Sequence, residues 1–171
     1  MKNTKKIAFA GIFSALSFIF LFVGSLFETL DLSAAALGSI VVLIAFIELG
    51  RSWALGVYAA ASLLSMLMLP NKTAAVIFTV FAGFYPVLKV LLHKIRPIWL
   101  SYAVRILCFN LFLTALIYIA ARLMGIVEDF LDFGFIIYGL SNVTFIVYDL
   151  ALERIAAYYS TKIKPKLFKL K

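Results

Sequence analysis

Long apolar runs separated by short polar breaks are the feature of this sequence that most restricts its fold. Residues 7–23 read IAFAGIFSALSFIFLFV and contain no charged side chain. A helix needs about 20 such residues to cross the ~30 Å hydrocarbon core of a bilayer. The chain is 65% hydrophobic and 14% charged, whereas soluble domains are about 25% charged. The sequence therefore predicts an integral membrane protein of the all-α class.

The runs and their breaks predict a single transmembrane domain, 1–171, that forms a bundle of six helices. Continuous runs favour helices, because the strands of a transmembrane barrel show only alternation over about ten residues. Pro97 ends the fourth run, since proline cannot continue a helix. The predicted spans are about 6–23, 33–49, 53–69, 73–92, 98–124 and 133–159, followed by a basic cytoplasmic tail, 160–171.

The distribution of lysine and arginine predicts the orientation. These residues gather at the amino terminus, after the second and fourth runs and in the tail. The opposite loops hold only Lys72, with Arg122 near the end of the fifth run. Because cytoplasmic loops are enriched in Lys and Arg, both termini of this multi-pass cell-membrane protein are expected in the cytoplasm. Membrane topology and contact of the tail with anionic lipid account for the net charge of +8, so no nucleic-acid partner is expected.

Small side chains recur on one face of the first predicted helix. Ala8, Gly11 and Ala15 are spaced at i, i+3 and i+7, which places them on the same side. The third predicted helix has a similar pair, Gly56 and Ala60. Small residues let the backbones of membrane helices approach closely. Two interpretations stay open: these faces pack against the protein's own helices, or they receive a helix of another protein.

This layout resembles the substrate-binding S component of energy-coupling factor (ECF) transporters. The resemblance rests on six short-looped helices, cytoplasmic termini and the small-xxx-small pairs of the first helix, Ala10/Ser14 and Gly11/Ala15, where the family has Ala-x-x-x-Ala. It implies a subunit that captures a vitamin-like micronutrient from outside and docks on a transmembrane coupling subunit joined to two ATPases. The docking residues would then be Ala8, Gly11, Ala15, Gly56 and Ala60.

Polar side chains toward the outer side of the predicted bundle are candidates for binding that small-molecule substrate. Amides and phenols are common in small-molecule pockets and equally common as glue between membrane helices. Pro86 frees a backbone carbonyl and predicts a kink in the fourth helix. The candidate substrate-binding residues are Tyr85, Asn110, Tyr138, Asn142, Arg122 and Glu28.

Ionisable residues inside the predicted spans form a second candidate site near the cytoplasmic side. Charged groups within a bilayer are costly and are usually paired or functional. Asp149 and Glu153 are spaced at i, i+4 and share a helix face. We expect Arg105 to bridge to Asp149 from the neighbouring helix, with Lys89 completing a buried ion-pair cluster. Such a cluster either fixes the register of the helices or relays protons or ions.

The sequence carries no signature of an enzyme. The motifs HExxH and GxSxG and the Walker loop are missing, and one His and one Cys offer little for a metal site. We therefore expect no catalytic residue, no metal and no cofactor, and energy from ATP would have to come from a partner. Two alternatives to the S component stay open. One is a cell-envelope scaffold similar in layout to the rod-shape protein MreD, without a small ligand; the other is a stand-alone small carrier.

Overall fold

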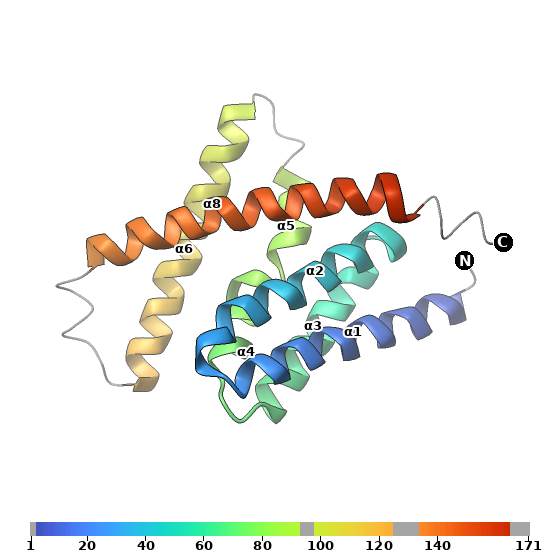
Figure 1. Ribbon diagram of the computed structural model, residues 1–171, viewed down its shortest axis with the longest axis horizontal. Coiled ribbons are helices and arrows are strands. Elements are labelled where there is room, and N and C mark those ends of the chain that lie inside the picture. The colour runs from blue at the N-terminus through green and yellow to red at the C-terminus, as the bar shows by residue number, and fades with distance from the viewer. Residues whose placement is uncertain (1–2, 93–97, 125–133, 165–171) are drawn as a thin grey trace. The chain divides into compact units, whose positions relative to one another are not determined.

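Figure 1 shows the computed structural model of the chain, which is built of helices. The structure describes residues 3–92, 98–124 and 134–164; the side chains of Glu28, Ile98, residues 119–124 and residue 134 lie outside this description. All secondary structure in these ranges is helical, which confirms the all-α class. Contacts between the helices divide the chain into two units, one formed by Met1–Leu88 with Ala151–Lys171 and the other by Lys89–Leu150.

The helices follow the predicted runs, with one difference in the fourth run and one in the sixth. The fourth run consists of α4, a π-helical segment η2 and α5, in place of one regular helix. The sixth ends in a second π-helical segment, η3, so the predicted tail begins inside a helix. The elements are α1 (Asn3–Ser25), the 3-10 turn η1 (Glu28–Leu30), α2 (Asp31–Leu49), α3 (Arg51–Met68), α4 (Thr73–Ile77), η2 (Phe78–Ala82), α5 (Tyr85–Leu92), α6 (Ile98–Met124), α8 (Gly134–Tyr158) and η3 (Tyr159–Ile163).

Within the described residues, five helical segments are long and apolar enough to cross a membrane: Asn3–Ser25, Asp31–Leu49, Thr73–Leu92, Trp99–Tyr118 and Phe135–Ile163. The protein is thus a helical multi-pass membrane protein by the length and hydropathy of its helices. The third predicted span, α3, is not among the five. It has 18 residues, and it contains Arg51 and three serines that lower its mean hydropathy. The sixth crossing therefore stays a prediction.

The core of the first unit is built largely from small residues. α1 and α2 lie side by side, and both also contact α3. A Cβ atom added to Gly24 on α1 would lie 2.1 Å from the Cβ of Ala34 on α2. About two turns earlier on α1, the Ser17 hydroxyl donates to the carbonyl of Gly38 on α2 over 3.3 Å. Small residues therefore do bring α1 close to α2, as close packing between membrane helices requires.

The break in the fourth run lies next to this core. The Tyr58 hydroxyl on α3 donates to the carbonyl of Thr79 in η2 over 2.6 Å. A Cβ atom at Gly83 would lie 2.7 Å from ring atoms of both Phe78 and Tyr58, so a bulkier residue does not fit at the end of η2. The kink predicted at Pro86 stays a prediction, whereas the structure shows a change of helix type, from η2 to α5, just before the proline.

A substitution at Gly24 tests the α1–α2 contact. Gly24→Ala forces the two backbones apart, and overpacking of this kind costs about 1–3 kcal/mol. We expect a lower melting temperature of the purified protein, measured by thermal unfolding in detergent. Gly139→Ala is the matched control, because a Cβ there meets no atom within 4 Å. An unchanged melting temperature for Gly24→Ala would show that the two helices are not this close.

Candidate functional site

The small residues of α1 fall on two faces with different surroundings. Ser14, Ser17 and Gly24 are buried. Ala8, Gly11 and Ala15 are exposed, and a Cβ atom added to Gly11 would meet nothing within 4 Å. The face predicted for docking, defined here as the open face of α1, is therefore uncovered within the described part of the chain.

The corresponding residues of α3 are less uniform. Gly56 is exposed, and a Cβ atom there would also find open space. Ala60 is half-buried, while its neighbour Ala61 belongs to the core of the first unit. Of the two α3 residues predicted to dock, Gly56 is thus the one that stands fully at the surface.

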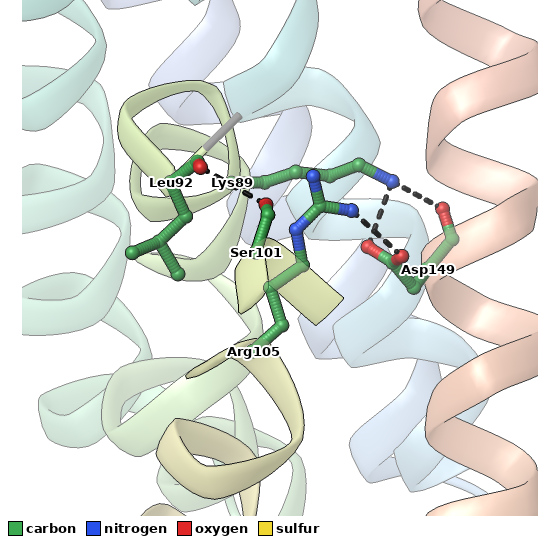
Figure 2. Close-up of polar contacts among 5 residues, drawn as sticks. All are labelled: Lys89, Leu92, Ser101, Arg105 and Asp149. Carbon is green, nitrogen blue, oxygen red and sulfur yellow. Dashed lines mark hydrogen bonds and ion pairs between the residues drawn. The ribbon is translucent and has the colours of Figure 1, made fainter. Parts of the chain in front are cut away.

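The second unit contains a buried ion-pair cluster, shown in Figure 2. The Lys89 ammonium lies 2.7 Å from Asp149 Oδ1, and Arg105 Nη1 lies 3.2 Å from Asp149 Oδ2. Lys89 also donates to the backbone carbonyl of Asp149. The exposed fractions of Lys89, Arg105 and Asp149 are 8%, 2% and 4%. One carboxylate therefore receives a cation from α5 and another from α6, and Glu153 lies one turn further along α8, half-buried.

Two further contacts hold this cluster in place. Ser101, one turn before Arg105 on α6, donates to the carbonyl of Leu92 at the end of α5 over 2.9 Å (Figure 2). The Arg105 guanidinium lies 5.0 Å from the centre of the Tyr102 ring, within the range of a cation–π interaction. The contact with Tyr102 restricts the arginine side chain independently of the ion pair. Less side-chain entropy is therefore lost when Arg105 pairs with Asp149.

Beyond the ion pairs, α6 and α8 continue to contact one another in an antiparallel register. The rings of Phe109 and Phe145 stack with their centres 4.4 Å apart and their planes at 7°. The next pair is Asn110 with Asn142. As the partners on α6 advance from Arg105 to Asn110, those on α8 retreat from Asp149 to Asn142. A stacked aromatic pair therefore lies between the ion pairs and an amide pair.

The amide pair belongs to a small hydrogen-bonded cluster that we call the amide clasp, comprising Asn110, Thr114, Tyr138 and Asn142. The two asparagine side chains donate to each other, over 3.0 and 3.1 Å. Each also donates to a backbone carbonyl, Asn110 to Ile106 and Asn142 to Tyr138, over 2.8 Å in both cases. The Thr114 hydroxyl lies 2.8 Å from the carbonyl of Asn110 and 2.8 Å from the Tyr138 hydroxyl. Unlike the ion pairs, the clasp is only partly buried.

The structure brings together three of the residues predicted to bind substrate. Asn110, Tyr138 and Asn142 meet in the amide clasp, whereas Tyr85 lies fully buried in the first unit, with its ring 4.9 Å from that of Phe81. Arg122 in α6 and Glu28 in η1 have side chains outside the described part of the structure. Thr114 is a member that sequence reasoning missed. Its spacing of four residues from Asn110 was the available signal, since the two share a helix face.

One lysine of the predicted tail, Lys164, contacts the protein itself. Its ammonium donates to the carbonyl of Ile47 over 2.9 Å and lies 3.8 Å from Glu48 Oε1. This lysine therefore stands at the carboxyl end of α2, where a cation also interacts favourably with the helix dipole. The contact of the tail with anionic lipid stays a prediction.

No group of three or more His, Cys, Asp or Glu side chains that could hold a metal ion occurs in residues 3–92, 98–124 and 134–164. The carboxylate of Asp149 is paired with Lys89 and with Arg105. Chemically, the described sites can pair charges and donate or accept hydrogen bonds.

Comparison of the chain with protein-family models, with curated proteins and with solved structures gave no match. The functional argument therefore rests on the residues and their geometry.

Substitutions in the ion-pair cluster should have unequal effects. Asp149→Ala strands two buried cations, whereas Arg105→Ala leaves the Lys89–Asp149 pair intact. Removing one partner of a buried pair costs about 3–5 kcal/mol. We expect Asp149→Ala to lower the melting temperature more than Arg105→Ala does.

The double variant Arg105→Ala/Asp149→Ala supplies the control for coupling. Its loss of stability should be smaller than the sum of the two single losses, because the second substitution removes a charge that the first left unpaired. Additive losses would mean that the two side chains do not interact energetically.

Proposed function

We propose that this protein is the membrane-embedded, substrate-binding subunit of an ATP-driven uptake transporter for a small micronutrient, of the energy-coupling factor type. The open face of α1 carries this proposal. Ala8, Gly11 and Ala15 form a line of small side chains that no described residue covers. In this reading, a transmembrane coupling subunit, itself joined to ATPases, covers them.

The physical reason lies in what drives helices together within lipid. Bulky apolar side chains contact lipid tails as favourably as small ones do. A row of small side chains therefore gives no stabilisation to a helix that contacts only lipid. A small face does let a second backbone approach closely, which increases van der Waals contact along both helices. α1 already uses this device on its buried side, where Gly24 meets Ala34. Its open face is suited to the same use with a partner helix.

The proposal includes six crossings with both termini in the cytoplasm. α2 and α3 are joined through a single residue, Gly50, whose φ of 92° reverses the chain direction at little steric cost. α3 then packs against both α1 and α2. A helix that returns along two membrane-spanning neighbours supports a crossing for α3, despite its lower hydropathy.

Cysteine labelling in intact cells tests this topology. In a Cys108→Ser background, a cysteine at Thr161 should react only with reagent that reaches the cytoplasm. A cysteine at Lys72 should react with impermeant reagent applied outside. Both positions are exposed in the structure, so accessibility to the reagent is not limited by burial. Labelling of both from the same side would contradict six crossings.

Substitutions on the open face test the docking. Gly11→Leu and Ala15→Leu place a branched side chain where the partner backbone would lie. The isolated protein should keep its melting temperature, because each new side chain enters open surroundings. Recovery of a membrane complex with ATPase activity, purified through this subunit from its native membranes, should fall at least about tenfold, the factor given by 1.4 kcal/mol of lost packing.

Gly139→Leu on α8 is the matched control, since Gly139 is exposed and a Cβ there also finds open space. It should alter neither stability nor recovery of the complex. Unfolding caused by Gly11→Leu and Ala15→Leu would instead assign the open face to internal packing and remove the basis of the proposal.

The second candidate function is a scaffold without a small ligand, and one observation favours it over a stand-alone carrier. The side chains of the amide clasp hydrogen-bond to one another, as side chains with the purely structural role of joining two helices would also do. Native mass spectrometry of the purified protein separates the two: a retained small molecule supports the transporter subunit, and co-purifying envelope-synthesis proteins without a ligand support the scaffold.

A further inference from the structure

The hydrogen-bonding state of the amide clasp restricts the kind of molecule that can bind there, if the proposed function is correct. The clasp contains two primary amides and two hydroxyl groups, and the question is which of their donors and acceptors are still available. An amide offers two N–H donors and two acceptor positions, and a hydroxyl offers one donor and two acceptor positions.

All four amide N–H groups already donate. Asn110 donates to Ile106 and Asn142, and Asn142 donates to Tyr138 and Asn110. The orientation of both amides is fixed by chemistry, because each nitrogen faces a backbone carbonyl that only accepts. Turning either amide over would bring oxygen against oxygen.

Both hydroxyl hydrogens are used as well. The Thr114 hydroxyl has a single hydrogen, and its bond to the carbonyl of Asn110 takes that hydrogen. The contact between Thr114 and Tyr138 then forms only if Tyr138 donates. What the clasp still offers is acceptor capacity on both amide oxygens and on the oxygens of Thr114 and Tyr138.

The aromatic surroundings point to the same kind of ligand. The clasp itself contains the aromatic ring of Tyr138, whose hydroxyl lies 2.8 Å from that of Thr114. The faces of such rings attract cations.

We propose that the amide clasp, comprising Asn110, Thr114, Tyr138 and Asn142, binds a small organic ammonium ion whose N–H groups donate to its free oxygen acceptors. A carboxylate or phosphate would find no free donor in the clasp and would meet oxygen lone pairs. The free acceptors would also take a neutral donor, but the aromatic ring of Tyr138 favours a cation, so the proposed substrate class is an amine that is protonated at neutral pH.

Binding of matched probes to the purified full-length protein tests this inference. Methylammonium, benzylammonium and tyramine provide ammonium groups of increasing size, and benzoate matches benzylammonium in shape with the opposite charge. At least one ammonium probe should raise the melting temperature in a saturable manner, while benzoate should not. Preference for benzoate, or no saturable shift with any ammonium probe, would overturn the proposal.

The substitution Thr114→Val gives a sharper test, because it keeps the side-chain shape and removes the hydroxyl. It deletes one acceptor and releases the hydrogen of Tyr138, so the clasp gains a free donor. We expect ammonium binding to weaken about 3- to 10-fold, the range of a single hydrogen bond, and benzoate binding to become detectable. A second variant, Tyr138→Phe, removes that donor again, so Thr114→Val/Tyr138→Phe should lose the benzoate binding.

Leu111→Ala is the control, because Leu111 is an exposed apolar residue of α6 and contributes no polar group. It should leave the affinity of every probe unchanged. If Thr114→Val changes affinity for benzoate and ammonium probes equally, hydrogen-bond capacity does not select the ligand. Ammonium binding without recovery of an ATPase complex would support this inference and count against the proposed function. Recovery of an ATPase complex without ammonium binding would support the proposed function and overturn this inference.

Discussion

The second unit depends on a single buried carboxylate. Asp149 on α8 receives Lys89 from α5 and Arg105 from α6, so three helical segments meet at two oxygen atoms. None of these charges can be hydrated at its depth, because all three side chains are almost fully buried. Each of the two cations is therefore tolerated only while Asp149 stays in place, and Asp149 needs at least one of them. This mutual requirement fixes how far α6 can slide along α8, and it sets the register in which the phenylalanine pair and the amide clasp meet.

The first unit achieves close packing by a different means. Its helices approach through glycine, alanine and serine, with the hydroxyl of Ser17 bound to a backbone carbonyl and Gly24 in contact with Ala34. Such packing adds no directional charge, and it can be repeated on any face that carries small residues. The open face of α1 is informative for this reason: small residues join helices on one side of α1, and they recur on its other side, where no described residue covers them.

The sequence predicted the helices well, because an apolar run of about 20 residues has few alternatives in a membrane. It also predicted that Arg105 and Asp149 would meet, since an isolated charge at that depth is too costly. It did not predict the π-helical segments, because changing one hydrogen-bond register leaves hydropathy unaltered. Nor could it place Tyr85: a phenol in an apolar helix is equally compatible with a pocket wall and with the core of the first unit, where it lies. Thr114 escaped notice because threonines in membrane helices usually bond to their own backbone.

The amide clasp shows why saturation of hydrogen bonds and recognition of a ligand are compatible. Amide side chains within a membrane need partners for their N–H groups, since an unused donor is the more costly group to bury. Once the two asparagines satisfy each other, their orientation is fixed and each amide oxygen keeps acceptor capacity. An amide oxygen that already accepts one hydrogen bond pays only a small free-energy penalty for its second, unused acceptor position. The same contacts that join α6 to α8 therefore prepare a surface that distinguishes donors from acceptors, and the stability of the unit and its selectivity have a common origin.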